Sequence, residues 1–265
     1  MGAGEILWAI DPLYSLSGFA VGSIVGLTGV GGGSLMTPLL ILLFNIHPAT
    51  AVGTDLLYAA VTKSAGTAVH GANRNVDWKI VGTLAAGSVT AAAITLYFLA
   101  HAGGSDPAFA RLVAIVLGVM LLITALSLLF RRRLFGFART HSELSPVLRA
   151  VVTVAFGAVL GVLVSISSVG AGAIGVTVLM LLYPRLPVMR IVATDIAHAV
   201  PLTLVAGIGH WIIGNVDWHM LASLLVGSIP GILIASFFAP RVPERLLRIL
   251  LAVVLFLVGV KLVLS

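Results

Sequence analysis

Long apolar runs, separated by short polar breaks, are the feature that most limits what this chain can fold into. Most of these runs hold about 20 residues, enough to cross roughly 30 Å of hydrocarbon as a helix. Two are shorter, since residues 34–44 and 173–183 would each form a helix only about 16 Å long. The ten runs cover approximately residues 15–30, 34–44, 48–72, 78–100, 111–130, 149–168, 173–183, 190–213, 218–238 and 245–264. This pattern predicts an all-α polytopic membrane protein.

The composition excludes the main alternatives. Only 9% of the 265 residues are charged and 60% are hydrophobic, whereas a soluble domain carries about 25% charged residues. An ordinary soluble enzyme is therefore excluded, and so is a disordered chain, which needs low hydrophobicity. The net charge of +6 comes from basic residues that lie between apolar runs. It therefore reflects membrane topology, and we expect no nucleic-acid partner. The absence of cysteine removes disulfides, thiolate metal sites and thiol catalysis.

The second half of the chain repeats the first. Residues 48–90 align without gaps on residues 188–230, at an offset of 140, with 12 of 43 pairs identical. The identical pairs include Thr54-Asp55 with Thr194-Asp195, His70 with His210, and Asn75-Val-Asp77-Trp78 with Asn215-Val-Asp217-Trp218. Upstream, Gly22-x3-Gly26 is matched with Gly157-x3-Gly161. Polar residues matched at fixed spacing indicate internal duplication.

Basic residues predict the orientation in the membrane. The longest polar segment holds Arg131-Arg-Arg133, Arg139 and Arg149, and the positive-inside rule places it in the cytoplasm. Each half would be a glycine-broken helix hairpin plus three transmembrane helices, so the two repeats would have inverted topology, with the N-terminus outside. We expect a first repeat over 1–130, a basic cytoplasmic loop over 131–148 and a second repeat over 149–265. The expected location is the plasma (inner) membrane.

A glycine cluster precedes each of the two short segments, Gly29-Val-Gly-Gly-Gly33 and Gly170-Ala-Gly172. Glycine lets the backbone leave the helical ladder, and at mid-membrane such backbone lines a cavity or is buried in protein. The helix that follows begins with free N–H groups and the positive end of its dipole, which predicts an anion site near the midplane. The residues expected there are Gly31, Gly32, Gly33, Ser34, Ser168, Gly170, Ala171 and Gly172. The alternative is close helix packing without a ligand.

Three charged side chains lie well inside apolar segments, where charge is costly and tends to be functional. Asp55 and Asp195 are expected to carry protons or bind a coupling cation, with Thr54 and Thr194 beside them in the same coupling or gating site. In the alternative interpretation, these aspartates and the preceding Thr54 and Thr194 satisfy the exposed backbone of the adjacent hairpin. Lys63, which has no counterpart in the second half, is expected to contact the anion or to pair with Asp55.

His70 and His210 lie near the far ends of the same two segments. Because histidine titrates near neutral pH, each could relay protons or contact an anion, although interfacial hydrogen bonding is the simpler role. The Asn-Val-Asp-Trp motif is expected to be architectural, with Asn75 or Asp77 capping the next helix and Trp78 in the aromatic belt. No H-E-x-x-H or G-x-S-x-G motif occurs, so we expect neither an enzyme nor a cofactor.

With these motifs assembled, the sequence resembles the TauE/SafE family of sulfite-exporter-like membrane proteins. The resemblance covers nearly the whole chain and rests on Gly26-Leu-Thr-Gly-Val-Gly-Gly-Gly-Ser34 with Pro38, on Ala51-Val-Gly-Thr-Asp55, on His70-Gly-Ala-Asn-Arg-Asn-Val-Asp-Trp78, and on their weaker second copies. It implies a secondary transporter of small sulfur-containing anions, such as sulfite, sulfonates or organosulfonates, with export as the usual direction. The second copy departs by having only two glycines.

The sequence therefore predicts an exporter that couples the anion to protons and works by alternating access. One alternative is an anion channel, which needs no coupling acid, and another is a non-transporting membrane scaffold or assembly protein. The expected partners are the anion, protons and the lipid bilayer. A homodimer is compatible with this prediction but not required, because inverted repeats can form a pathway within one chain.

Overall fold

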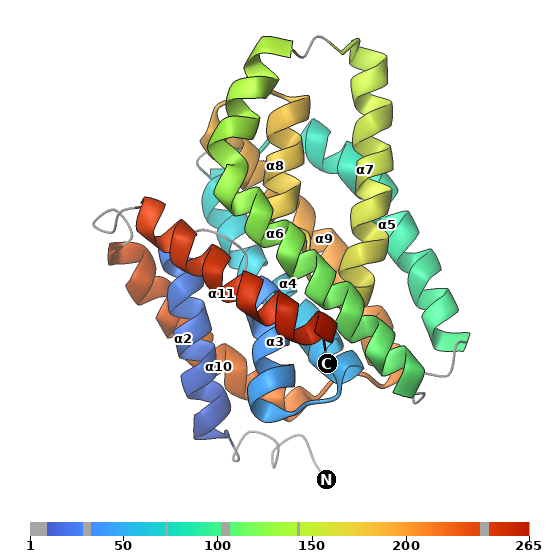
Figure 1. Cartoon of the computed structure of the whole chain (residues 1–265), viewed down its shortest axis with the longest axis vertical. Coiled ribbons are helices and arrows are strands. Elements are labelled where there is room, and N and C mark those ends of the chain that lie inside the picture. Colours follow the sequence, from blue (N-terminus) through green and yellow to red (C-terminus); the bar gives the residue numbers. More distant parts are fainter. Residues whose placement is uncertain are drawn as a thin grey trace.

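Helices form every regular element of the residues that this computed structural model describes, which are 10–28, 33–72, 74–101, 107–141, 144–238 and 244–264 (Figure 1). In chain order they are α2 (Pro12–Thr28), α3 (Gly33–Phe44), α4 (Pro48–Ala72), α5 (Trp78–His101), α6 (Pro107–His141), α7 (Pro146–Ser167), α8 (Ala173–Leu182), α9 (Val188–Ile213), α10 (Trp218–Phe238) and α11 (Glu244–Leu264). These residues contain no strand, which confirms the all-α prediction.

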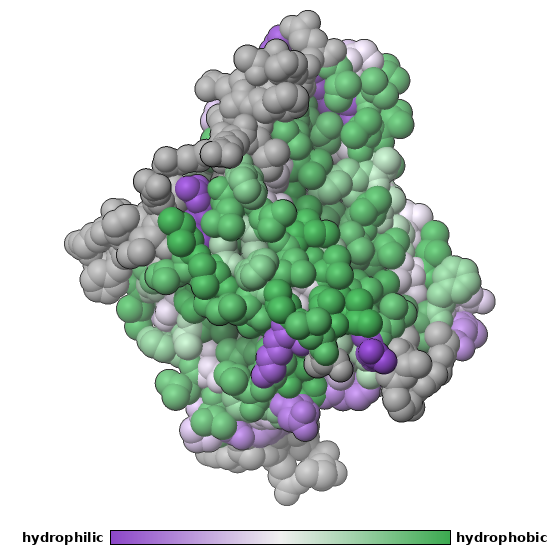
Figure 2. All heavy atoms as spheres, viewed as in Figure 1, coloured by the Kyte–Doolittle hydropathy of each residue, from purple (hydrophilic) through white to green (hydrophobic). Residues whose placement is uncertain are grey.

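Helix length and surface character agree with a membrane protein. Among the described residues, five helices are long and apolar enough to cross a bilayer, namely α5, α7, α9 and most of α6 and α10. The two short helices are also present, α3 with 12 residues and α8 with 10. Figure 2 shows a face that is apolar over most of its middle, with polar residues near its edges. The predicted class, a polytopic membrane protein, is confirmed.

The segment predicted as a basic loop over 131–148 is mostly helical. Helix α6 continues without a break to His141, because arginine, leucine and alanine are good helix formers and charge alone does not end a helix. The next helix begins at Pro146 and is capped by Ser145, whose Oγ accepts the N–H of Leu148 at 3.3 Å. The cytoplasmic position of this segment remains a prediction.

Helices far apart in the sequence pack closely through glycines. Helix α2 packs against α10, and a side chain at Gly18 or Gly22 would collide with the backbone of Leu224 or Ser228. Without a strong hydrophobic drive in lipid, such small residues let helices approach and gain van der Waals contact.

The pairing of α7 with α5 corrects one sequence match. Gly157 and Gly161 lie against the backbone of Leu84 and Ser88, which are 140 residues before Leu224 and Ser228. The counterpart of Gly157-x3-Gly161 is therefore Gly18-x3-Gly22, and the predicted match with Gly22-x3-Gly26 is wrong. Shifting the match by four residues is about one helical turn and leaves the glycines on the same helix face. Residue spacing therefore could not distinguish the two matches, whereas the packing partners do.

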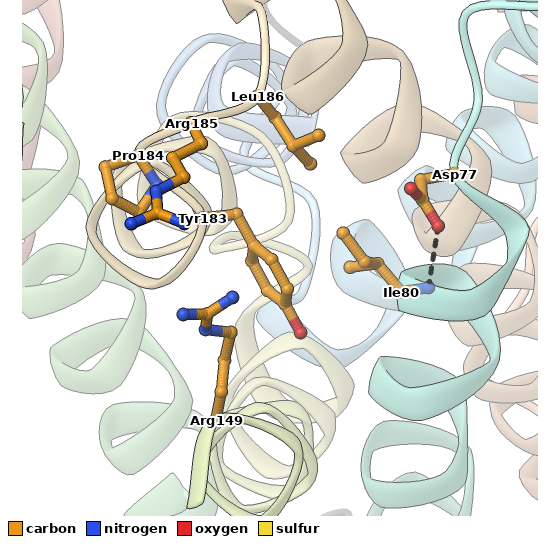
Figure 3. Close-up of a pocket in the computed structure, with 7 residues that line it drawn as sticks. All are labelled: Asp77, Ile80, Arg149, Tyr183, Pro184, Arg185 and Leu186. Carbon is orange, nitrogen blue, oxygen red and sulfur yellow. Dashed lines mark hydrogen bonds between the residues drawn. The ribbon is translucent and has the colours of Figure 1, made fainter. Parts of the chain in front are cut away.

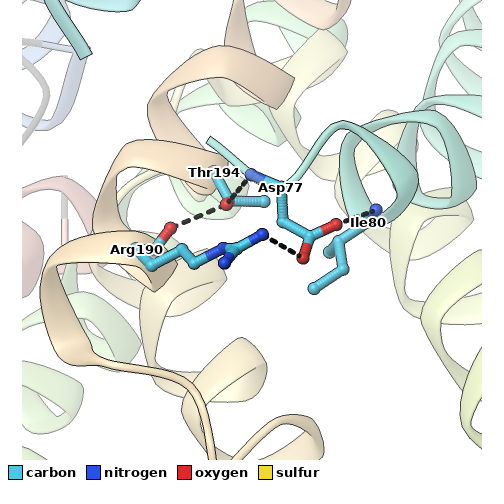
Figure 4. A network of polar contacts seen from close by, with 4 residues as sticks. All are labelled: Asp77, Ile80, Arg190 and Thr194. Atoms are coloured by element: carbon cyan, nitrogen blue, oxygen red, sulfur yellow. Dashed lines mark hydrogen bonds and ion pairs between the residues drawn. The ribbon is translucent and has the colours of Figure 1, made fainter. Parts of the chain in front are cut away.

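Hydrogen bonds between α4, α9 and the connections that precede α5 and α10 also come in pairs offset by 140. The Asp77 N–H donates to Thr194 Oγ1 at 2.9 Å, and the Asp217 N–H donates to Thr54 Oγ1 at 3.1 Å. Figure 4 shows the first of these, where Arg190 also pairs with Asp77 at 3.2 Å. Each half thus holds the other at matched positions. Their opposite orientation across a membrane remains a proposal.

The same connections bear out the capping role of the Asn-Val-Asp-Trp motif. Asp77 Oδ1 accepts the N–H of Ile80 at 3.4 Å, and Asp217 Oδ1 accepts the N–H of Met220 at 2.9 Å. Each aspartate therefore caps the first turn of its helix, α5 or α10.

Candidate functional site

The connection between α7 and α8 breaks the helix inside the protein. Ser168 adopts the left-handed conformation at φ 59°, and its N–H closes α7 on the carbonyl of Val164. Gly170 and Gly172 follow with φ of 130° and 133°, a region that side-chain-bearing residues rarely adopt. The predicted glycine-broken hairpin is confirmed for this cluster. In the first cluster, Gly31 and Gly32 lie outside the described residues, and Gly33 begins α3.

Asp55 is fully buried on α4 and joins two elements from different halves. Its Oδ2 accepts hydrogen bonds from Thr37 Oγ1 of α3 at 2.5 Å and from Ser168 Oγ of the α7–α8 connection at 2.9 Å. Its Oδ1 has no hydrogen-bond partner among the described residues. The carboxyl group therefore ties the short helix of one half to the broken connection of the other.

Asp195 of α9 is also fully buried but lacks such donors. Neither of its carboxylate oxygens has a hydrogen-bond partner in the described part of the chain. It lies against the first turn of α8, so closely that a methyl group on Gly175 would strike Oδ1. The Gly172 amide lies near the same carboxylate, although the two do not meet the geometry of a hydrogen bond. Asp195 is thus a carboxyl group beside the positive end of a helix dipole.

Lys63 completes a buried group of three ionisable side chains. It is 8% exposed, and its Nζ donates to the carbonyl of Ala171 at 3.2 Å. It attracts both Asp55 and Asp195, although no direct ion pair joins it to either within the described residues. One cation therefore faces two carboxyl groups at the α7–α8 connection, and Lys63 contacts a carbonyl at the predicted anion site.

Backbone amides at the start of α8 remain available. The N–H groups of Gly175 and Val176 bond to the carbonyls of Gly170 and Gly172 at 3.2 and 2.8 Å. Among the described residues, no hydrogen bond is found for the N–H groups of Ala171, Ala173 or Ile174. Free amides at a helix start bind anions readily, so this geometry is compatible with the predicted site.

Several predicted residues form no hydrogen bond with the three ionisable side chains in the described part of the chain. Thr54 and Thr194 accept backbone hydrogen bonds from the connections before α10 and α5, so they satisfy backbone there rather than at the adjacent hairpin. His210 is buried, and its Nε2 bonds the carbonyl of Ser165 at 2.8 Å. Ser34 is buried in the first turn of α3. The side chain of His70 lies outside the described residues.

Two buried polar pairs escaped the sequence prediction. Tyr58 Oη bonds Ser228 Oγ at 2.5 Å, and His198 Nε2 bonds Ser88 Oγ at 2.8 Å. Tyr58 and His198 occupy positions 140 apart, but they are different residues, so the identical pairs of the repeat do not include them. A polar side chain at the same place in both apolar segments was the signal that could have found them.

A cleft of about 160 Å³ opens at the start of α5 and α7 (Figure 3). Arg149 and Arg185 direct their guanidinium groups into it beside Tyr183. The Arg149 guanidinium lies 5.6 Å from the centre of the Tyr183 ring, a distance typical of a cation–π contact. The Tyr183 hydroxyl is anchored by Thr153 at 2.9 Å. Two arginines and Asp77, which pairs with Arg190, line this cleft next to the predicted cytoplasmic loop.

Apolar helices, charges buried at a broken-helix connection and basic residues at the ends define an integral membrane protein with several spans. The sequence matches the family described as Sulfite exporter TauE/SafE over residues 14–262. The chain therefore belongs to the TauE/SafE family of membrane transporters and is not an enzyme.

Relatives across bacteria and archaea support this assignment. The chain is 38% identical over 250 residues to the probable membrane transporter protein YjnA of Bacillus subtilis (strain 168), covering 94% of this chain and 98% of that protein. It is 30% identical over 232 residues to YdhB of the same organism, a probable membrane transporter protein, covering 87% and 91%. It is 24% identical over 266 residues to the probable membrane transporter protein MJ0441 of Methanocaldococcus jannaschii, covering 94% and 93%. No solved structure gives a significant match.

Proposed function

We propose that this chain exports small sulfur-containing anions, such as sulfite, sulfonates or organosulfonates, coupled to protons and by alternating access. The family match supports the anion class, because its description is Sulfite exporter TauE/SafE. The observation that carries the proposal is the buried group of Asp55, Asp195 and Lys63 beside free amides at the start of α8.

The charge balance of this group explains why an anion would need a proton. With both carboxyl groups ionised, Lys63 compensates only one of them, and a bound anion would add a second uncompensated negative charge. Buried charge without compensation is strongly unfavourable. A proton on one carboxyl group restores neutrality before the anion arrives, so anion and proton favour each other's binding.

Of the two carboxyl groups, Asp195 is the one we expect to take up the proton. Asp55 accepts two hydroxyl hydrogen bonds that stabilise its negative charge, whereas Asp195 accepts none from the described residues. The anion would then bind the amides of Ala173 and Ile174, close to the neutralised Asp195. This arrangement predicts that anion and proton cross the membrane together.

Alternating access would follow from the contacts that join the two halves. Asp55 holds α3 and the α7–α8 connection at once, and all three ionisable groups are buried. Opening to either side would require these contacts to separate. The inverted repeats would supply two such openings, one for each side.

Proteoliposomes loaded with methanesulfonate test the proposal, because the charge of a sulfonate does not change near neutral pH. Efflux should accelerate when the interior is made more acidic than the exterior. Acceleration by the opposite gradient would overturn the co-transport argument. Absence of flux for sulfite and every sulfonate tested, with folded protein, would overturn the transport proposal and favour a scaffold.

The variant Asp195→Asn separates a carrier from a channel. We expect it to lose acceleration by the pH gradient while anion exchange continues, because the coupling proton has lost its site. The matched control is Asp11→Asn, at a residue that caps α2 through the N–H of Leu13 at 2.7 Å, since asparagine caps equally well. Gradient-independent conduction in both wild type and variant would identify a channel.

A further inference from the structure

A second and larger cleft is lined by elements that Figure 1 places at the opposite end of the molecule from the start of α7. Its volume is about 670 Å³, within the range of roughly 300–1,000 Å³ typical of ligand pockets. It lies among the α3–α4 connection, the start of α6 and the end of α11. Its polar lining residues are Asn45, His47, Arg111 and Lys261.

The crossing of α6 with α11 brings two of these cations to one place. The helices touch where Gly118 and Gly259 face each other, each close enough for an added Cβ to lie 2.9 Å from the other's carbonyl oxygen. Arg111 precedes Gly118 by about two turns, and Lys261 follows Gly259 by two residues. The glycine contact therefore places Arg111 and Lys261 at the same end of the helix pair.

The distribution of charge makes this pair unusual. Of the 15 lysine and arginine residues in the chain, Lys63 is buried, and the predicted topology puts all but two of the others on the cytoplasmic side. The two exceptions are Arg111 and Lys261, and both line this cleft. Basic residues are disfavoured on the outer side, so two that converge on one cleft require a reason other than topology.

The lining is suited to an anion with a small apolar part. Arg111 and Lys261 are exposed and form no ion pair within the part of the chain that the structure describes. None of the described residues that line the cleft is acidic, and Ile41, Leu42 and Leu262 supply apolar surface. Helix α4 begins at Pro48, which also lines the cleft, so its dipole adds positive potential.

We propose that this cleft is an outer vestibule that binds an organosulfonate-class anion between the buried site and the external solution. The proposal rests on the proposed transport function. The two clefts occupy equivalent places in the two halves of the chain. Asn45 and Ile46 line this cleft, and the residues 140 positions later, Arg185 and Leu186, line the Arg149 cleft. Both clefts thus open beside the connection that follows a short helix, while their cations come from non-equivalent positions.

Because the chain contains no cysteine, a single cysteine can report occupancy directly. The variant Ala114→Cys places it in the lining, and cells expressing it are treated with a membrane-impermeant maleimide. We expect labelling from outside, slowed several-fold by methanesulfonate, and loss of this protection when Arg111→Gln and Lys261→Gln are added. If methanesulfonate does not slow labelling of the Ala114→Cys protein while Arg111 and Lys261 are still present, the proposal is overturned.

A lipid head group carries related chemistry, so the purified single-cysteine variant is also labelled in vesicles of phosphatidylcholine with and without phosphatidylglycerol. Protection by methanesulfonate in pure phosphatidylcholine supports the vestibule. Protection by phosphatidylglycerol alone, with no effect of methanesulfonate, overturns it and assigns the cleft to lipid. This readout needs no flux, so it can fail or succeed independently of the transport proposal.

Flux provides the second measurement. In proteoliposomes, the Arg111→Gln and Lys261→Gln double variant should raise the KM for methanesulfonate on the vestibule side by about tenfold with little change in kcat, because a cleft of one charge concentrates counter-ions. The matched control removes two exposed cations elsewhere, Arg74→Gln and Lys79→Gln, and should leave that KM unchanged. Equal effects of the two double variants would overturn the proposal.

Discussion

Removing the Thr37 hydroxyl should destabilise the protein by an amount that depends on the charge of Asp55. Thr37 Oγ1 lies 2.5 Å from Asp55 Oδ2, and both side chains are fully buried. The substitution Thr37→Val keeps the shape of the side chain and deletes the donor. A hydrogen bond to a charged group contributes about 1.5–3 kcal/mol to stability, against about 0.5–1.5 kcal/mol for a neutral pair.

These magnitudes define a double-mutant cycle with Asp55→Asn. We expect Thr37→Val to lower the free energy of unfolding by about 2 kcal/mol in the wild-type background and by about 1 kcal/mol in the Asp55→Asn background. The coupling energy would then be about 1 kcal/mol, which a cycle can measure. Reversible unfolding of the four proteins in bicelles, without substrate, supplies the values.

The matched control is Thr177→Val on α8. Thr177 lies 140 residues after Thr37 and is also buried, but its Oγ1 donates to the carbonyl of Ala173 in its own helix at 2.7 Å. It should therefore show no coupling to Asp55→Asn. Equal losses for Thr37→Val in both Asp55 backgrounds would refute the reasoning, because the hydroxyl would then act without regard to the charge on Asp55.

Two further predictions test the backbone and the contact between halves. Gly172→Ala should abolish thermal stabilisation by methanesulfonate, since φ is 133° there, whereas Gly82→Ala, on a helix with open space around it, should retain it; equal stabilisation of both variants would contradict a backbone anion site. Thr54→Val and Thr194→Val should each lower the free energy of unfolding by about 1–3 kcal/mol, because each leaves a backbone amide, of Asp217 or Asp77, without its hydrogen-bond acceptor. A loss of stability in only one of the two variants would contradict their equivalence.

Much of the architecture could be predicted from local sequence. The short helices α3 and α8 begin and end within about one residue of the predicted segments 34–44 and 173–183, because apolar runs and glycine breaks act on nearby backbone. The burial of Asp55, Asp195 and Lys63 was also predictable, since each lies well inside an apolar segment and away from the polar breaks. The end of α6 could not be predicted in this way, because arginines mark a membrane boundary without ending a helix.

The partners of the buried charges depended on tertiary structure. Asp55 meets Ser168 across 113 residues of sequence and Lys63 meets Ala171 across 108, and nothing local specifies either contact. The prediction placed amides toward the ligand, yet a carbonyl of the same connection turned out to face Lys63.

What the sequence determined by itself was the class, the spans, the duplicated motifs and the few charges that had to be buried, because hydropathy and polar spacing are properties of short segments. The tertiary structure decided which helix crosses which. It showed that Gly18, and not Gly26, is the counterpart in the glycine match. It also brought Arg111 and Lys261 together in one cleft and placed the carbonyl of Ala171 against Lys63. Apolar helices resemble one another in composition, so their crossings are chosen by shape and small-residue contact, which only the folded chain expresses.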